Sequence, residues 1–248
     1  ETSEADHYAL EQALQLKDSL ESEVLVVSLG PARVIQTLKE ALAKGADRAM
    51  HIRTDADAQL DPLQVANAMA AAISAEHCDL IFSGLQSDDQ GFAQTGVMLA
   101  ECLGYPHASI AIEMLLENNR VRVRRELEAG YSQWLEIGLP CALTIQSGMN
   151  KPRYANMKGI LAAKKKPITE IELKDVLAPD VVASQRIEKI YVPQKVKKIL
   201  MLDGTSHEQA QALLARVQQL QAQVGAGGSA PVVKAGVGSD SSSCPLIG

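Results

Sequence analysis

The chain has 248 residues, enough for one large domain or for a domain with an appendage. Hydrophobic residues make up 46% and aromatic residues only 3%, so we expect a core of small aliphatic side chains, which suits strands covered by helices on both faces. The net charge of −6 and the scattered basic residues argue against nucleic acid as a partner. No apolar run approaches the roughly 18 residues that span a bilayer, so no direct membrane insertion is expected.

Helix and strand patterns alternate up to Leu103. The hydrophobic periodicity predicts helices over 8–20, 32–43, 62–76 and 93–103 and strands over 23–29, 48–53 and 79–83. Asp61 and Pro62 form the clearest helix start, because an N-cap residue is followed by proline at the first helical position. Strands separated by helices of this length predict a mostly parallel sheet with right-handed crossovers.

The pattern changes after residue 107. Extended runs indicate strands over 108–116, 120–127, 131–137 and 141–146. Asn118-Asn119 and Ala129-Gly130 separate the first three runs, so hairpins are expected there. The rest is predicted as an irregular stretch over 147–169, a short helix over 172–177, a helix over 206–224 and a flexible tail after Gly225.

The loop from Gly84 to Gly96 carries the strongest sign of ligand binding. It breaks a buried strand at glycine and opens a helix, where backbone N–H groups and the helix dipole favour an anion such as phosphate. The alternative is an ordinary loop whose Ser, Asp and Thr only cap the helix. A second loop, Ser28–Ala32, ends the first strand. Since the carboxyl ends of neighbouring parallel strands share one crevice, we expect both loops to hold one ligand, unless the second is merely a turn.

No catalytic constellation emerges from the sequence. The five histidines lie far apart and form no metal motif, and the nucleophile elbow, the Walker loop and the glycine-rich dinucleotide fingerprint are absent. The cysteines also share no metal-type spacing, and we interpret them as thiols of a reducing compartment: Cys78, Cys102, Cys141 and Cys244.

A basic and partly apolar segment lies within the stretch 147–169. Its basic residues are Lys151, Arg153, Lys158, Lys164, Lys165 and Lys166. The apolar residues among them are Tyr154, Met157, Ile160 and Leu161. A charge run is usually a solvated face, but long ordered connections are more often functional, so we interpret the segment as a protein-docking loop.

Four arginines lie on the strand over 120–127. Arg120, Arg122 and Arg124 share one face of a strand, and Arg125 points to the other. Ordinary cross-strand surface pairs are therefore the expected role of Arg120 and Arg122.

Taken together, these segments resemble the β (small) subunit of electron transfer flavoprotein. The matching segments are Val27–Ala32, Ala41–Arg48, Gly84–Gly96, Arg125–Gly130 and Asn150–Ala155 with the lysine run after it. They are collinear over residues 3 to 205, and Asn-Lys-Pro-Arg-Tyr-Ala before a lysine-rich stretch is a specific signature. The details are similar to the bacterial type that serves trimethylamine- or dimethylglycine-type dehydrogenases.

The resemblance implies a fold and a set of partners. The fold is α/β, a mostly parallel three-layer sheet of the adenine-nucleotide α-hydrolase-like kind, with an antiparallel hairpin extension and a C-terminal arm and helix. A larger α subunit holds most of one FAD, and this subunit binds a structural AMP. The heterodimer is an electron carrier rather than an enzyme, and it passes electrons from a flavoprotein dehydrogenase to the electron transfer flavoprotein–quinone oxidoreductase. The implied compartment is the bacterial cytoplasm, or the mitochondrial matrix in a eukaryote.

The same resemblance implies an organisation of the chain. Residues 1–146 form the nucleotide-binding domain, 147–169 the partner-recognition loop, 170–224 an arm and helix packing on the α subunit, and 225–248 a flexible tail. Family members also have a strand and a hairpin before the first helix, with that strand central in the sheet, and residue 1 of this chain falls after them.

Site residues carry over position by position. The residues implied for AMP are Ser28, Leu29, Gly84, Gln86, Ser87, Gln90, Gly91, Phe92, Ala93, Gln94 and Thr95. Gln94 and Thr95 are expected at the phosphate, through backbone N–H groups and the Thr hydroxyl. Arg125 and Glu126 are implied at the flavin domain. The residues implied for partner recognition are Tyr154, Met157, Lys158, Ile160, Leu161, Lys164 and Lys165.

Two other functions remain open at this point. Electron-bifurcating relatives place a second FAD in the same cleft, and their loop typically carries Asp-Gly-Asp-Thr. This chain has Asp89-Gln-Gly-Phe92, which favours AMP. A stand-alone adenine-nucleotide-binding module is the other alternative.

Overall fold

The computed structural model describes residues 2–56, 58–192 and 200–226. The chain divides into two compact units, Glu1–Lys189 and Ile190–Gly248. The first unit holds every described strand, and the second contains one described helix, α7 (Ser206–Ala226).

The strands of the first unit form two sheets. Three parallel strands make the smaller sheet, in the order β1 (Leu25–Gly30), β2 (Arg48–Arg53) and β8 (Ile168–Glu172). Five strands make the larger one, in the order β3 (Leu80–Gly84), β7 (Cys141–Ile145), β4 (His107–Glu117), β5 (Arg120–Glu126) and β6 (Ser132–Gly138). The pairs β3–β7 and β7–β4 are parallel, whereas β4–β5 and β5–β6 are antiparallel. The predicted α/β fold with an antiparallel extension is confirmed.

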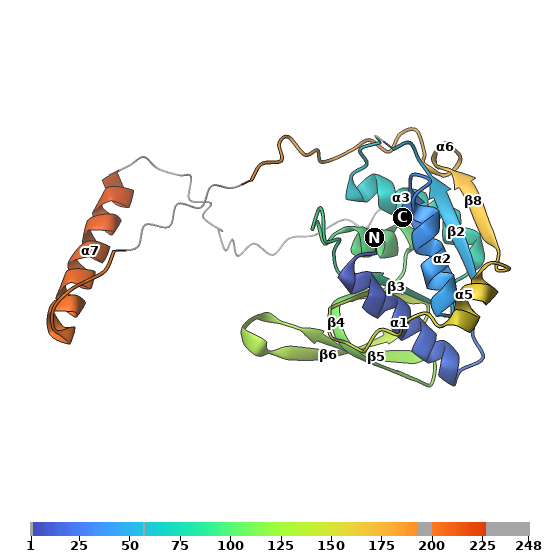
Figure 1. Cartoon of the computed structure of the whole chain (residues 1–248), viewed down its shortest axis with the longest axis horizontal. Coiled ribbons are helices and arrows are strands. Elements are labelled where there is room, and N and C mark those ends of the chain that lie inside the picture. The colour runs from blue at the N-terminus through green and yellow to red at the C-terminus, as the bar shows by residue number, and fades with distance from the viewer. Residues whose placement is uncertain (1, 57, 193–199, 227–248) are drawn as a thin grey trace, which may run out of the picture. The chain divides into compact units, whose positions relative to one another are not determined.

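Helices cover both faces of the strand layer (Figure 1). On one side Leu14 of α1 (Glu4–Ser19) and Leu42 of α2 (Val34–Lys44) pack with Ala163 of α5 (Met157–Ala163). On the other side α3 (Pro62–Ile73) and α4 (Thr95–Leu103) pack on Met50 of β2. This second cluster takes in Leu25 and Val27 of β1 and Ile81 of β3, so both sheets belong to one layer.

The inner edges of the two sheets are not joined by strand pairing. Among the described residues β1 pairs only with β2, and β3 pairs only with β7. Most of β1 and all of β3 is half-buried, whereas the centre of β2 and all of β7 are buried. The central strand implied by the family resemblance stays a prediction.

Two local signals in the sequence are confirmed by the backbone. The Asp61 carboxylate accepts the N–H of Gln64 at 2.9 Å, and the Gln64 side chain accepts the N–H of Asp61 at 3.3 Å. This reciprocal capping box, with Pro62 at the first helical position, starts α3. Asn118 and Asn119 have φ of 49° and 63°, the left-handed values that a two-residue hairpin turn between β4 and β5 requires.

The expectation of an irregular stretch over 147–169 is wrong in part. Asn156 caps the helix α5 by accepting the N–H of Gly159 at 2.7 Å, and β8 begins at Ile168. β8 lacks strict alternation of apolar residues, and it is a strand because its backbone pairs with β2. The short helices η1 (Ser74–Glu76), η2 (Glu128–Gly130) and α6 (Leu173–Val176) complete the unit.

In the second unit α7 begins at the predicted place. Thr205 donates its N–H to Glu208 at 2.7 Å and accepts the N–H of Glu208 at 3.4 Å, a second capping box. Leu213, Leu214 and Val217 on this helix are exposed. Packing of this arm and helix on an α subunit stays a prediction, and the predicted flexible tail from residue 227 onward lies outside the described residues. Every helix in the described parts of the chain is too short or too polar to cross a bilayer.

Core packing on α2 generates the first prediction. Leu38 is fully buried between α2 and the small sheet, so Leu38→Ala leaves a cavity and is expected to lower the free energy of unfolding by about 2–5 kcal/mol. Leu115→Ala, at a side chain that is 42% exposed, is the control and should lower it by less than about 1 kcal/mol. Urea unfolding of both variants checks this, and equal losses would contradict the packing described.

Candidate functional site

The loop between β3 and α4 is tied to the start of α1. The N–H of Gly84 donates to the Asp6 carboxylate at 2.7 Å, and the N–H of Asp88 donates to the Ser3 hydroxyl at 3.1 Å. In return the Asp88 carboxylate accepts the N–H of Glu4 at 2.9 Å. A Cβ on Gly84 would lie 2.8 Å from the backbone nitrogen of Asp6, so the close approach of α1 requires glycine here.

Inside the loop, side chains already satisfy several backbone donors. The Ser87 hydroxyl accepts the N–H groups of Gln90 and Gly91 at 3.3 and 3.4 Å, and the Asp89 carboxylate accepts that of Gln90 at 2.7 Å. The left-handed φ of 63° at Gly91 is ordinary for glycine, but the φ of 54° at Ala93 is one that an L side chain rarely adopts. Backbone strain is therefore held just before α4.

The N-terminus of α4 is open. Gln94 occupies the N-cap position, and no side chain of the described residues caps the helix. The first N–H groups of a helix need a partner, and anions are favoured there. Gly96 in this first turn lies so close to β3 that a Cβ would clash with the Ser83 hydroxyl oxygen. Of the expected AMP residues, Gln86, Gln90, Gly91 and Ala93 are exposed, and Gly84, Ser87, Phe92, Gln94 and Thr95 are half-buried.

Three carboxylates lie at this loop, those of Asp6, Asp88 and Asp89, and their negative charge opposes anion binding nearby. Burial raises the pKa of Asp6, although the hydrogen bond from Gly84 opposes the rise. Hydrogen bonds from the Ser87 hydroxyl and the N–H of Gln90 lower the pKa of Asp89. All three carboxylates accept hydrogen bonds from backbone N–H groups, which offset part of their charge and leave the uncapped end of α4 as the anion-favouring position.

The end of β1 is fixed separately, by a buried histidine. The ring of His51 is fully buried, and its Nε2 lies 2.8 Å from the carbonyl oxygen of Gly30, so Nε2 carries the proton. The N–H of Thr54 donates to the same carbonyl at 3.2 Å. Ser28 and Leu29 are half-buried just before this point. Among the described residues no hydrogen bond joins these two residues to Gly84–Thr95.

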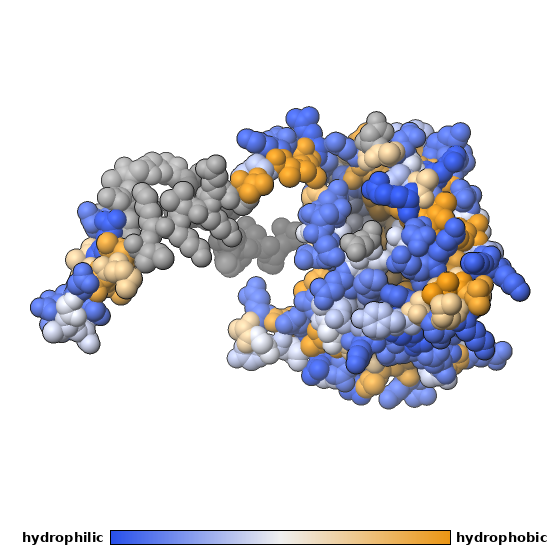
Figure 2. All heavy atoms as spheres, viewed as in Figure 1, coloured by the Kyte–Doolittle hydropathy of each residue, from blue (hydrophilic) through white to orange (hydrophobic). Residues whose placement is uncertain are grey.

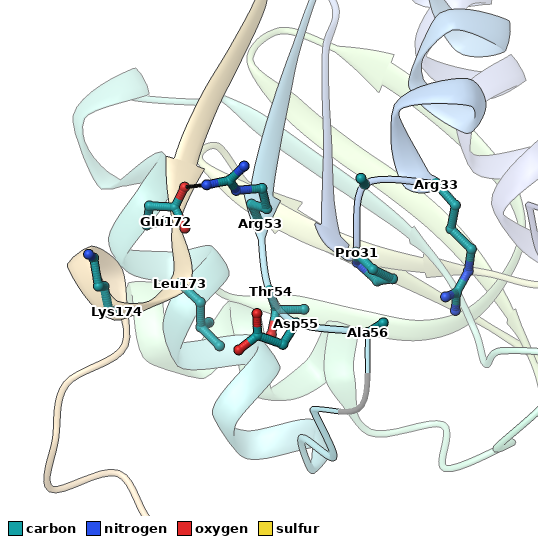
Figure 3. A pocket seen from close by; sticks show the side chains of 10 residues that line it. Pro31, Arg33, Arg53, Thr54, Asp55, Ala56, Glu172, Leu173 and Lys174 are labelled. Carbon is teal, nitrogen blue, oxygen red and sulfur yellow. Dashed lines mark ion pairs between the residues drawn. The ribbon is translucent and has the colours of Figure 1, made fainter.

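A pocket of about 750 Å³ opens at the carboxyl ends of β1, β2 and β8 (Figure 3). It contains none of the residues expected at AMP, although Pro31 and Ala32 line it. Arg53 and Glu172 form an ion pair within it, and Figure 3 shows Arg33 and Lys174 at its opposite ends. Asp55 also lines the pocket, so acidic side chains lie among the basic ones. This mixture does not favour an anion, and the volume of the pocket alone does not make it the nucleotide site.

The helix α5 and Tyr154 before it present apolar side chains to solvent. The exposed fractions are 93% for Tyr154, 73% for Met157, 44% for Ile160 and 58% for Leu161. Lys158, Lys164 and Lys165 are exposed around them. Elsewhere on the face drawn in Figure 2, hydrophilic side chains predominate and hydrophobic ones gather in patches. A cluster of exposed apolar residues rimmed by lysines is typical of a protein-docking surface.

The position of α5 depends on the C-terminus of α2. A Cβ on Gly159 would clash with the carbonyl oxygen of Ala43, so glycine lets the two helices touch through their backbones. Lys166 donates to the carbonyl oxygens of Leu42 and Ala46 at 3.0 and 2.5 Å, where a cation also complements the helix dipole. Unlike its two neighbours in the lysine run, Lys166 is therefore an anchor.

A second anchor joins the segment before α5 to α1. The Glu11 carboxylate is buried and receives the Arg153 Nε at 2.8 Å, the Arg153 Nη2 at 3.0 Å and the Arg153 backbone N–H at 3.1 Å. The same Nη2 reaches Asp18 at 2.8 Å. Burial acts to raise the pKa of Glu11, but the hydrogen bonds from Arg153 and Gln15 outweigh it and hold that pKa below 4.5.

Comparison with known proteins decides the family. The family model described as "Electron transfer flavoprotein domain" matches residues 1–176. The chain is 40% identical to the electron transfer flavoprotein subunit beta of Methylophilus methylotrophus over 228 residues, covering 88% of this chain and 86% of that protein. Identity to the subunit beta of Sus scrofa is 36% over 216 residues, covering 86% and 82%, and to the mitochondrial subunit beta of Arabidopsis thaliana 36% over 199 residues, covering 79% and 78%. The chain belongs to the electron transfer flavoprotein β-subunit family.

Membership of this β-subunit family implies an α-subunit partner and an association with flavin. Two residues of the hairpin strand β5, Arg125 and Glu126, are the ones that the family resemblance implies at the flavin domain. Arg125 donates to the Ser109 hydroxyl at 3.2 Å, and the Glu126 carboxylate accepts the Gln146 amide at 3.2 Å. Both residues lie at the end of β5, and their contact with a flavin domain stays a prediction.

The opposite face of β5 carries the other arginines, as predicted. Arg120 pairs with Glu136 at 2.9 Å, and Arg124 pairs with Glu113 at 2.8 Å. The guanidinium of Arg122 lies 5.4 Å from the ring centroid of Trp134, and in the part of the chain that the structure describes it pairs with no carboxylate.

Sequence reasoning missed several residues that shape the β subunit's candidate sites. Ser3 before α1 and Asp6 within it hold the loop after β3, Glu11 of α1 holds the segment before α5, and Gln185 donates to Gln94 at 2.8 Å. All of these contacts join residues far apart in the chain, so no local motif marks them. The only available sign was Arg153 within the specific signature, which needs an acidic partner once it is half-buried.

The Glu11–Arg153 pair generates a pH-dependent prediction. Because the folded-state pKa of Glu11 is depressed, the stability that the pair contributes is present above the unfolded value near 4.5 and is lost as the pH falls through the folded-state pKa. Glu11→Gln is expected to lower the free energy of unfolding at pH 7 by about 1–3 kcal/mol. The difference from the unmodified protein should shrink as the pH drops below 4.5.

The matched control for this prediction is Glu21→Gln, at an exposed glutamate just beyond α1. It should change the free energy of unfolding by less than about 0.5 kcal/mol. Denaturant unfolding at several pH values provides the measurement. A Glu11→Gln effect that does not vary with pH would contradict the role of an ionised Glu11.

Proposed function

We propose that the heterodimer formed by this β subunit carries electrons from a flavoprotein dehydrogenase to the electron transfer flavoprotein–quinone oxidoreductase. The redox group is FAD, held mainly by the α subunit, and when bound it supplies the reversible electron chemistry. This chain contributes scaffold, a structural AMP and the surface that docks on the dehydrogenase. It carries no chemical step of its own. Family membership supports this assignment.

AMP is proposed at the loop between β3 and α4. The observation that supports this most is the uncapped N-terminus of α4, where Thr95 adds a hydroxyl beside the open N–H groups. Gly96 lets the first turn of α4 lie against β3, and Gly91 leaves the loop before it without a side chain. Ser28 and Leu29 at the end of β1 are proposed to line the adenosine, and the loop Gly84–Ala93 to enclose it.

The loop sequence favours AMP over a second flavin. Bifurcating relatives typically carry Asp-Gly-Asp-Thr at the position of Asp89–Phe92, and this chain has a bulky Phe92 there. Phe92 is half-buried in the loop. The bifurcating subunit is therefore the second candidate, and the stand-alone nucleotide-binding module the third.

Docking on the dehydrogenase is proposed at α5. The exposed Met157 is the adaptable anchor, since an unbranched thioether side chain fits irregular apolar hollows. Lys158, Lys164 and Lys165 steer an acidic partner and chiefly raise the association rate. Arg125 and Glu126 are proposed at the α subunit's flavin domain, and the arm with α7 on its body. The proposed compartment is the bacterial cytoplasm, or the mitochondrial matrix if the source is a eukaryote.

The nucleotide content of the native αβ complex tests this function. Denaturing the purified complex and quantifying released nucleotides by mass spectrometry should give one AMP and one FAD per heterodimer. Two FAD without AMP would assign the chain to the bifurcating class. A nucleotide without any flavin would leave only the binding module.

Truncation of Met157 tests the docking surface. Met157→Ala is expected to reduce kcat/KM for reduction of the bound FAD by the cognate dehydrogenase about tenfold, through KM, because anchor residues carry most of an interface's binding energy. Leu20→Ala, at a 49% exposed apolar residue just after α1, is the control and should leave kcat/KM unchanged. Both variants should retain FAD and AMP. An unchanged kcat/KM in Met157→Ala would place docking elsewhere.

A further inference from the structure

Residues 181–185, here named the strap, run over the starts of both α3 and α4. The strap follows α6 within the first compact unit. Gln64 donates its side-chain amide to the carbonyl oxygen of Val181 at 3.3 Å. Farther along, the N–H groups of Ser184 and Gln185 donate to the Asp61 carboxylate at 2.6 and 3.2 Å. The strap is thus held by α3 at both ends.

Asp61 performs two tasks with its two oxygens. Oδ1 accepts the N–H of Gln64 and caps α3, while Oδ2 accepts both N–H groups of the strap. The residue is 5% exposed. Burial acts to raise its pKa, but the hydrogen bonds from Gln64, Ser184 and Gln185 outweigh burial and lower it, so the carboxylate stays ionised near neutral pH. Charge-assisted hydrogen bonds of this kind are the stronger ones in proteins.

The strap also reaches the open end of α4. The Gln185 side chain donates to the Gln94 Oε1 at 2.8 Å. Gln94 is the N-cap residue, and its carbonyl accepts the N–H of Met98 at 2.9 Å, but its side chain does not cap the helix. Because Gln185 holds the Gln94 amide, that side chain is kept from folding back onto the first-turn N–H groups. Those groups remain available for a ligand.

We propose that the strap fixes the N-terminus of α4 in its nucleotide-binding conformation, with Asp61 and Gln185 as positioning residues that do not touch the nucleotide. The inference rests on the proposed function, because it takes AMP to bind at this helix end. It goes beyond that function by making retention of AMP depend on α3 and on a segment about 90 residues away from the loop.

The experiment uses the native αβ complex and AMP as the probe. Radiolabelled AMP is bound, and its release is followed after a chase with unlabelled AMP. Asp61→Asn keeps an N-cap acceptor for α3 but turns N–H donors toward those of the strap, and Gln185→Ala removes the contact with Gln94. Each variant is expected to release AMP about tenfold faster or more, with unchanged FAD content. Val182→Ser, at a strap side chain that is 73% exposed, is the matched control and should behave as the unmodified complex.

A double-mutant cycle separates positioning from a general loss of structure. Gln94→Ala and Gln185→Ala should be non-additive in their effects on AMP release, because each removes the same contact. Circular dichroism establishes that the variants are folded. Release at the unmodified rate in folded Asp61→Asn and Gln185→Ala overturns the inference while leaving the proposed function intact, and so does full additivity in the cycle. An unmodified complex without AMP overturns both.

Discussion

The buried carboxylate of Glu11 receives three hydrogen bonds from Arg153, and the position of the surface proposed for docking depends on this contact. Arg153 anchors the segment before α5 to α1. Within α5, Gly159 packs against the carbonyl group of Ala43, and after the helix Lys166 donates hydrogen bonds to the end of α2. A seven-residue helix is too short to be stable alone, so its conformation comes from these anchors. Exposed apolar side chains can then be presented at little entropic penalty on binding.

The helix α1 also holds the loop between β3 and α4, where AMP is proposed to bind. Its first residues accept or donate hydrogen bonds to Gly84 and Asp88, while its middle holds Arg153. One rigid element therefore sets both the loop proposed for AMP and the surface proposed for the dehydrogenase. The carboxylates around the loop would repel a phosphate if left unpaired, and the backbone donors that satisfy them are part of what makes an anion site compatible with an acidic protein.

The sequence predicted correctly those features that depend on a few neighbouring residues. The cap at Asp61, the turn at Asn118-Asn119 and the face of β5 that carries Arg120, Arg122 and Arg124 are all as expected from the sequence. The strand β8 was missed because only its pairing with β2 makes it a strand. The helix α5 was missed because it contains Gly159, which lowers helix propensity but is required for close packing against Ala43. The loop Gly84–Thr95 was found from its glycines, yet its contacts with Ser3, Asp6 and Gln185 are long-range and leave no mark on any single segment.

The separation of Glu11 from Arg153 along the chain has a consequence for biogenesis. These residues are 142 positions apart, and so are Tyr8 and Asn150, which form a neighbouring hydrogen bond. A chain that emerges from the ribosome in order must keep α1 without these partners until most of the first unit has been made, and contacts between such distant residues form slowly. The conformation of α5, the helix proposed for docking, therefore becomes fixed only after Arg153 has met Glu11, late in the synthesis of the first unit.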